Sequence, residues 1–181
     1  MSRRIVRPWL AIIACALLPF AAPQAANPIQ SLKQLREQGV VMQRWENSCA
    51  AASVATVLTY AFHDPTSERE AAEQMLVATD PARVRARGGF SLLDLKTFVV
   101  ARGYDGNAYR GLSFDDIRAF HAPIVPIDAK GYNHYVVVNG VVGQEVLLAD
   151  PAFGNRRMDK SEFERIWMDG IAFVITRAEA P

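Results

Sequence analysis

The stretch QRWENSCAAASVATVL, residues 43–58, places a glutamine and a cysteine just before a run of small and apolar residues. Asn47 or Ser48 can cap a helix there, and apolar side chains all round the predicted helix indicate that it is buried. Cys49 then lies in the first turn, where the helix dipole and free backbone N–H groups stabilise a thiolate. The stretch therefore predicts a buried helix with a cysteine in its first turn.

The N-terminal segment carries the other cysteine of the 181-residue chain, Cys15. Three arginines among the first seven residues precede an apolar run over residues 9–22, with small residues at 25 and 26. This pattern is typical of a secretory signal peptide, so we predict a signal peptide over residues 1–26 and export of the rest. A retained membrane anchor, a lipoprotein box ending at Cys15 and a twin-arginine signal are the alternatives.

The remaining residues, 27–181, suit one domain with a single core. Half of the chain is hydrophobic and 22% is charged, as in ordinary globular proteins. The 20 basic and 19 acidic residues become 17 and 19 once Arg3, Arg4 and Arg7 are lost. This balance gives no support to nucleic acid or an anionic membrane as a partner.

Cys49 would be the single cysteine of the exported chain, in a compartment where thiols tend to be oxidised. Three interpretations follow: a buried inert residue, an intermolecular crosslink, or a reactive thiol. Burial is the default for a cysteine on an alanine-rich helix considered alone. The choice depends on which residues elsewhere could serve the thiol as partners.

The pattern of apolar residues changes at Pro123. Before it, helical spacing and capping residues predict five helices and one short strand. The helices cover about 29–38, 49–60, 67–79, 91–102 and 113–122, and the strand covers 40–42. After it, β-branched runs predict strands over 124–127, 134–138, 145–149 and 171–175, with a helix over about 160–168. This order indicates an α+β fold whose N-terminal helical half packs on a C-terminal antiparallel sheet, leaving a cleft between them.

Several classes of site have no support in the sequence. It contains no phosphate-binding Gly-Lys-Ser or Gly-Lys-Thr loop, no nucleophile-elbow serine, no glycine-rich dinucleotide turn, and no cysteine or histidine pair at metal-ligand spacing. We therefore expect no ATP, no other cofactor and no metal. What remains is Cys49, with three histidines as candidate bases.

His134 is the strongest candidate base. It begins the most β-branched strand of the chain, whereas His63 and His121 each lie beside a turn that contains proline and are interpreted as surface or cap residues. Asp150 ends the next strand, so a hairpin would bring His134 and Asp150 together across two strands. The carboxylate would then hold the imidazole ring and its tautomer. Considered alone, Asp150 is more simply a strand terminator.

Gln43 lies six residues before Cys49. A turn through residues 45–48 would fold its amide beside the helix start. There the amide and the backbone N–H of Cys49 could together stabilise a developing oxyanion. Trp45, within this turn, is either a wall of the cleft or part of the core.

The order of these motifs resembles the bacteriocin-processing cysteine peptidases, family thirty-nine of that class. The matching residues are Gln43 and Cys49, then HYVVV at 134–138, DPAFG at 150–154, and Phe163 with WMDG at 167–170. The resemblance covers about residues 40–176 and implies a papain-like fold. It also implies that Cys49 is the nucleophile, His134 the general base and acid, Asp150 the orienting residue and Gln43 the oxyanion donor. Ala50 stands where the family commonly has glycine.

The best-known members of that family are fused to a membrane exporter with an ATP-binding domain, and they cut leaders after Gly-Gly on the cytoplasmic side. We expect neither module here, and the predicted export signal implies a different substrate, although a narrow cleft that tolerates glycine can persist. Free-standing exported members fit the resemblance, and some of these accompany secretion systems for functional amyloid fibres.

The leading hypothesis is a periplasmic cysteine endopeptidase without a cofactor. Its substrate would be a secreted or periplasmic protein or peptide, such as a component of a secretion or amyloid-fibre system. Two alternatives use the same residues. A cysteine acyltransferase or transpeptidase would pass the acyl group to an amine instead of water. A peptide-binding chaperone or adaptor would keep the fold without turnover.

Overall fold

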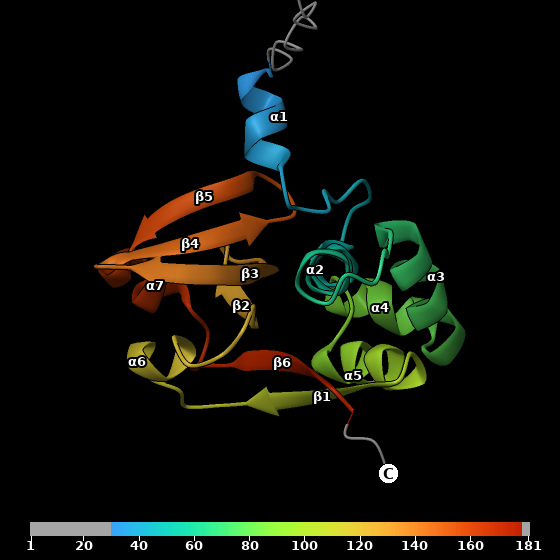
Figure 1. Cartoon of the computed structure of the whole chain (residues 1–181). Helices are drawn as coiled ribbons and strands as arrows, with labels where there is room; N and C mark the ends of the chain where they lie inside the picture. Colours follow the sequence, from blue (N-terminus) through green and yellow to red (C-terminus); the bar gives the residue numbers. More distant parts are fainter. Residues whose placement is uncertain (1–29, 179–181) are drawn as a thin grey trace, which may run out of the picture.

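Helices and strands occupy separate halves of the molecule (Figure 1). The computed structural model describes residues 30–178. The helical half contains α2 (Cys49–Thr56), the π-helix η1 (Val57–Ala61), α3 (Glu68–Ala78), α4 (Pro81–Arg87) and α5 (Leu92–Ala101). α1 (Leu32–Glu37) lies at the edge of the sheet instead. The other half holds the sheet with two short helices, α6 (Phe114–Ile117) and α7 (Lys160–Ile166).

The sheet has six strands, all paired antiparallel, in the order β1-β6-β2-β3-β4-β5. The strands are β1 (Tyr104–Tyr109), β2 (Ile124–Asp128), β3 (Asn133–Val142), β4 (Glu145–Asp150), β5 (Gly154–Asp159) and β6 (Ala172–Arg177). β3 and β4 form the expected hairpin, in which Val142 pairs with Glu145 across the turn. The predicted α+β class, with a helical half packed on an antiparallel sheet, is confirmed.

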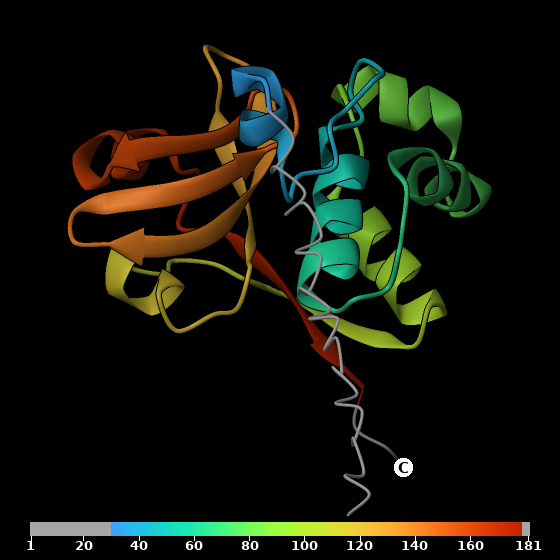
Figure 2. The ribbon, with the colours of Figure 1, turned by 45° about the horizontal axis from the view of Figure 1, so that its top comes forward.

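α2 is the central helix, and all eight of its residues are buried. Figure 2 shows it between the sheet on one side and α3, α4 and α5 on the other. Ala50, Ala51 and Val54 pack in one core cluster with Val137 of β3 and Phe173 of β6. Their small side chains let the helix lie close to the sheet. This packing fixes the position of the first residue of α2 relative to the start of β3.

A second core cluster covers the opposite face of the sheet, because successive residues of a strand point to opposite faces. Val136 and Val138 of β3 face this cluster, whereas Val137 faces α2. Phe163 of α7 and Phe114 of α6 complete it, with their ring centroids 6.4 Å apart. Both faces of the sheet are therefore covered, which makes β3 and β4 a rigid support for any side chain at their ends.

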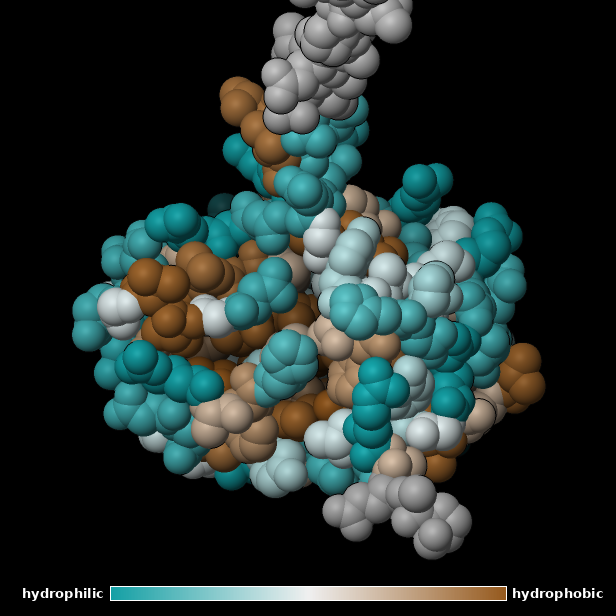
Figure 3. All heavy atoms as spheres, in the orientation of Figure 1, coloured by the Kyte–Doolittle hydropathy of each residue, from teal (hydrophilic) through white to brown (hydrophobic). Residues whose placement is uncertain are grey.

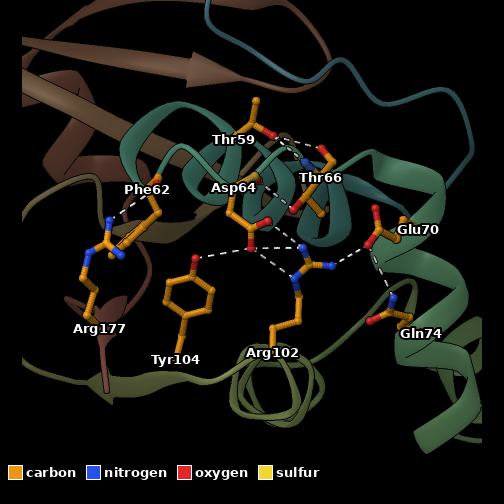
Figure 4. Close-up of polar contacts among 9 residues, drawn as sticks. All are labelled: Thr59, Phe62, Asp64, Thr66, Glu70, Gln74, Arg102, Tyr104 and Arg177. Atoms are coloured by element: carbon orange, nitrogen blue, oxygen red, sulfur yellow. Dashed lines mark hydrogen bonds and ion pairs between the residues drawn. The ribbon is translucent and has the colours of Figure 1, made fainter. Parts of the chain in front are cut away.

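An ion-pair cluster joins α3, α5 and the loop after η1 (Figure 4). Arg102, at the end of α5, lies 2.8 and 3.0 Å from the two carboxylate oxygens of Asp64 and also pairs with Glu70 of α3. Tyr104 donates its hydroxyl to Asp64 at 3.3 Å. The cluster holds the far end of the α2–η1 segment against its neighbours.

The structure adds two strands and one helix to those predicted. β1 (YDGNAY) and β5 (GNRRMD) are poor in β-branched residues, and each becomes a strand by pairing with a neighbour along its whole length. In α4, Asp80 caps the first turn through a 2.8 Å bond from the Ala82 N–H, and Pro81 takes the first helical position. Asp80-Pro81 therefore starts a new helix as well as following α3.

The prediction of a strand over residues 40–42 is wrong. The segment joins no strand, because its donors bind elsewhere. The Val41 N–H donates to the Thr56 hydroxyl of α2 at 3.0 Å. The Gln43 N–H that follows donates to the Pro151 carbonyl at 2.8 Å. The segment instead links α1 to the start of α2 and ties both to the turn after β4.

α1 buries none of its residues. Leu32 and Leu35 are 84% and 47% exposed, and apolar atoms are visible on this helix in Figure 3. The helix lies against the edge strand β5, where Asn155 donates its side-chain amide to the Gln38 carbonyl at 2.7 Å. The signal peptide predicted over residues 1–26 lies outside the described residues. Between residues 30 and 178, no helix combines the length and apolar character needed to cross a bilayer.

Candidate active site

Cys49 is the first residue of α2 and is 6% exposed. Ser48 takes the N-cap position, but its hydroxyl makes no capping bond to the helix. It donates instead to the Trp45 carbonyl at 2.7 Å and to Glu68 at 2.5 Å. The first backbone N–H groups of α2 therefore have no side-chain cap and can stabilise negative charge on the thiol or on a substrate oxygen.

His134 and Asp150 are in contact. Nε2 of His134 lies 2.8 Å from Oδ1 of Asp150, whose side chain is completely buried. The hairpin register pairs Val137 with Ala149, so Asp150 falls opposite Val136 and the two residues are diagonal neighbours, not directly opposite ones. This bond occupies Nε2 and leaves Nδ1 as the ring nitrogen available to the thiol.

Asp150 has three further partners. Its Oδ1 accepts the Ala152 N–H at 2.9 Å and the Phe153 N–H at 3.3 Å, and its Oδ2 lies 2.8 Å from Arg156 Nη1. Burial alone would raise the pKa of Asp150, but the bonds to His134, Ala152 and Arg156 lower it below its usual value. Asp150 is thus a fixed carboxylate anion. Arg156 was not found from the sequence, where nothing distinguishes it from its neighbour Arg157.

The charge state of His134 follows from these neighbours. Burial alone would lower its pKa, but the hydrogen bond and charge of Asp150, together with interaction with the Cys49 side chain, raise the pKa to about 9. The imidazole is therefore protonated at neutral pH. An imidazolium beside a cysteine favours the thiolate, which is the nucleophilic form.

Gln43 lies on the other side of the turn that leads to α2. Its side-chain oxygen is buried, without a hydrogen-bond partner among the residues that the structure describes. Glu68, only 4% exposed, holds the turn by accepting the Arg44 N–H at 2.8 Å and the Ser48 hydroxyl at 2.5 Å. The sequence indicates Glu68 only as a residue at the start of a helix, so this tethering role was missed.

The four predicted residues do not all touch, but three of them line one cleft. This main cleft, of about 540 Å³, is lined by Gln43, Cys49 and His134, and also by Tyr132, Ala152 and Phe153. Asp150 lies behind His134, out of solvent. The arrangement sets a thiol, a charged imidazole and an amide around one space, the groups that acyl transfer on a cysteine would use.

Two smaller hollows adjoin the main cleft. A side hollow of about 230 Å³ shares Cys49 with it and continues over Gly88, Gly89 and Phe90. Phe90 also lines an apolar hollow of about 390 Å³, together with Trp45. Trp45 is 43% exposed and packs against Arg69, 5.2 Å from its ring centroid, so it is a wall of this hollow and not a core residue.

The other two histidines of the chain lie away from the main cleft. His63 lies in the loop after η1, and His121 lines a separate hollow beside Asn139 and Gly140. Neither lines the main cleft. Within residues 30–178, no three His, Cys, Asp or Glu side chains are grouped so that they could hold a metal ion.

Comparison with known protein families matches residues 37–180 to the model of the Peptidase C39 family. The chain belongs to the Peptidase C39 family. The resemblance drawn from the sequence motifs is thereby confirmed, and with it the assignment of the chain as a cysteine peptidase.

Two curated relatives of this C39 peptidase share one name, "Probable functional amyloid protease FapD". The relative from Pseudomonas aeruginosa is 35% identical over 148 residues, which cover 81% of this chain and 64% of the relative. The relative from Pseudomonas fluorescens is 30% identical over 168 residues, 92% of this chain and 73% of the relative. The chain thus spans about two thirds of the length of these relatives.

Solved structures show the same fold. A double glycine motif protease from an AMS/PCAT transporter, in complex with its leader peptide, has 26% identity and a TM-score of 0.62, covering 77% of this chain and 91% of that one. The peptidase domain of Streptococcus ComA has 22% identity and a TM-score of 0.64, covering 77% and 98%. The papain-like fold predicted for this C39 peptidase is confirmed.

The raised pKa of His134 makes the stability of this C39 peptidase depend on pH. A pKa of 6.5 in the unfolded chain and about 9 in the folded protein contributes stability that is complete below pH 6.5 and is lost as the pH rises through 9. We expect the free energy of unfolding to fall by up to about 3 kcal/mol across this range. Urea unfolding at pH 6, 7.5 and 9 measures the effect. A His134→Gln variant should lack this fall, and an equal fall in the variant would assign it to other groups.

Proposed function

We propose that the chain is an exported cysteine endopeptidase that acts through Cys49, His134, Asp150 and Gln43. The hydrogen bond between His134 and Asp150, in a cleft that also contains Cys49 and Gln43, carries the proposal. A buried, charged His–Asp pair beside a thiol at the start of a helix is typical of a catalytic site, and a pair that only stabilised the fold would not need the thiol.

The proposed reaction begins with the Cys49 thiolate and the His134 imidazolium. The sulfur attacks the peptide carbonyl, and the resulting oxyanion accepts hydrogen bonds from the Gln43 amide and the backbone N–H of Cys49. His134 gives its proton to the leaving amine as the C–N bond breaks, which leaves a thioester on Cys49. Water then attacks the thioester, His134 takes one proton from the water, and the C–S bond breaks to reform the thiolate. The carboxylic acid product leaves and loses its proton to solvent.

Asp150 acts in this scheme as an orienting residue. Its Oδ2 is bound to Arg156, so Oδ1 faces His134 from a fixed direction. The carboxylate stabilises the imidazolium and keeps Nδ1 directed at the sulfur. The two backbone N–H groups on Oδ1 favour its ionised form.

The substrate that we propose is an extended segment of an exported protein, in the periplasm. The names of the relatives support a component of a functional-amyloid or other secretion system, and the structure in complex with a leader peptide supports a peptide ligand. The wall of the side hollow comes close to the turn before α2, since a Cβ on Gly89 would lie 3.1 Å from the Asn47 carbonyl oxygen. We propose small residues, glycine among them, before the scissile bond, which the double glycine motif named for the solved relative also supports.

A peptide probe tests the proposal. A short peptide that ends in glycine and carries a vinyl sulfone should label Cys49 of the native chain much faster than the urea-denatured chain, as measured by intact mass. Equal labelling rates would contradict an activated nucleophile and favour the adaptor alternative. Cleavage of peptides with and without added amines then separates hydrolysis from acyl transfer by product mass.

A further inference from the structure

We propose that Tyr132 and Phe153 form a subsite for an aromatic or large apolar side chain immediately after the scissile bond. This inference rests on the proposed function and specifies its substrate. Both residues line the main cleft, as His134 does, and neither lines the side hollow. Tyr132 lies two residues before His134, and the Phe153 N–H shares Asp150 Oδ1 with the His134 ring.

The direction of the bound peptide follows from proton transfer. The imidazolium must deliver its proton to the leaving amine, so the residue that carries this amine lies next to His134. The wall of the main cleft beside His134 is therefore the leaving-group side. The side hollow over Gly88 and Gly89 receives the acyl side of the substrate.

Phe153 is exposed but held in place. Its ring is 61% exposed, and the guanidinium of Arg156 lies 5.4 Å from the ring centroid. Its backbone N–H donates to Asp150 Oδ1 at 3.3 Å. The residue that orients His134 therefore also positions this ring. A fixed aromatic surface binds a ligand at a smaller cost in conformational entropy than a mobile one.

Tyr132 is 77% exposed and lies two residues before His134. It occupies the tight turn between β2 and β3, which the Ala129 N–H closes by donating to the Tyr132 carbonyl at 2.9 Å. Two large aromatic side chains are thus presented to solvent on the histidine side of one cleft. Covering them with an apolar substrate residue removes apolar surface from water, which is favourable.

Partition of the acyl-enzyme tests the subsite without knowledge of the natural substrate. A glycine-terminated peptide benzyl thioester would acylate Cys49 and release benzyl thiol. Phenylalanine amide or glycine amide then competes with water. The amine attacks the thioester carbonyl and gives one proton to His134. An amide bond forms as the C–S bond breaks, and the sulfur is released as a thiolate. Product masses give the ratio of aminolysis to hydrolysis.

We expect phenylalanine amide to capture the acyl group about tenfold better than glycine amide in the native chain, a ratio typical of an apolar pocket. Phe153→Ala and Tyr132→Ala should each bring this preference toward one, and Phe153→Leu should restore part of it. Tyr60→Ala removes an aromatic residue that is 49% exposed on η1, away from the main cleft, and should change neither preference nor turnover.

Two outcomes would contradict the proposed subsite and leave the proposed function intact. One is equal capture of the two amines by the native chain, and the other is a preference that survives in both alanine variants while their thermal unfolding matches that of the native chain. A native chain that never turns over the thioester would instead overturn the proposed function and the subsite with it.

Discussion

Replacing Cys49 by alanine is expected to abolish peptide cleavage and leave the fold intact. Loss of a nucleophile typically lowers turnover by about 10⁶-fold. Alanine fits the site, because residues 50–52 of the same helix are alanines and are fully buried. Thermal unfolding at pH 7 should change by no more than the typical single-substitution effect of about 1 kcal/mol.

The measurement pairs cleavage of a synthetic peptide with calorimetry on the same samples. His63→Ala and His121→Ala are control variants that should keep full activity, since both residues lie outside the main cleft. A Cys49→Ala variant that still cleaves the peptide would show that another residue is the nucleophile. If the variant loses activity because it unfolds, the probe-labelling experiment on the native chain decides whether Cys49 is the nucleophile.

Asp150→Ala is expected to damage both stability and activity. It would leave the Arg156 guanidinium and the His134 ring without their buried partner, and breaking a buried pair in this way costs about 3–5 kcal/mol. The loss should be larger at pH 6 than at pH 9, because the stability linked to the raised pKa of His134 is present at low pH and disappears above its folded pKa.

Asp150→Asn separates orientation from folding. The amide keeps the volume of the carboxylate but carries no charge, so it cannot stabilise the imidazolium. Turnover should fall, but by less than the about 10⁴-fold loss of the equivalent change in a serine-protease triad, because papain-like proteases can use asparagine in this position. The loss of stability should be smaller than in Asp150→Ala. Urea unfolding and peptide cleavage at pH 6 and 9 measure both quantities. Full activity of Asp150→Asn would exclude the proposed role of this carboxylate.

The parts of the fold that the sequence predicts are those with a strong local signal. An alanine-rich apolar run predicts α2, and runs of valine and isoleucine predict the centres of β2, β3, β4 and β6. The hairpin between β3 and β4 needs only a short turn, so the proximity of His134 and Asp150 could be expected from two neighbouring strands.

Features that depend on distant segments could not be predicted in this way. β1 lies in a polar stretch and becomes a strand only because β6, more than sixty residues later in the chain, pairs with it. Arg156 acts through Asp150 on another strand, and Glu68 acts through Arg44 and Ser48 in the turn before α2. An isolated charged residue has no pattern that reveals such partners. The residues predicted to react are therefore easier to find from sequence than the residues that fix their positions through hydrogen bonds.

The two edges of the sheet bear on how such an enzyme could handle aggregation-prone chains. An unpaired edge strand is a template on which another extended chain can add. β5 carries Arg156 and Arg157 on its edge and is flanked by α1, and β1 contributes an aspartate, a glycine and an asparagine in succession. Neither edge is a long apolar strand. If the substrate is an extended polypeptide, as proposed, neither edge of this sheet offers it a long apolar strand on which to add.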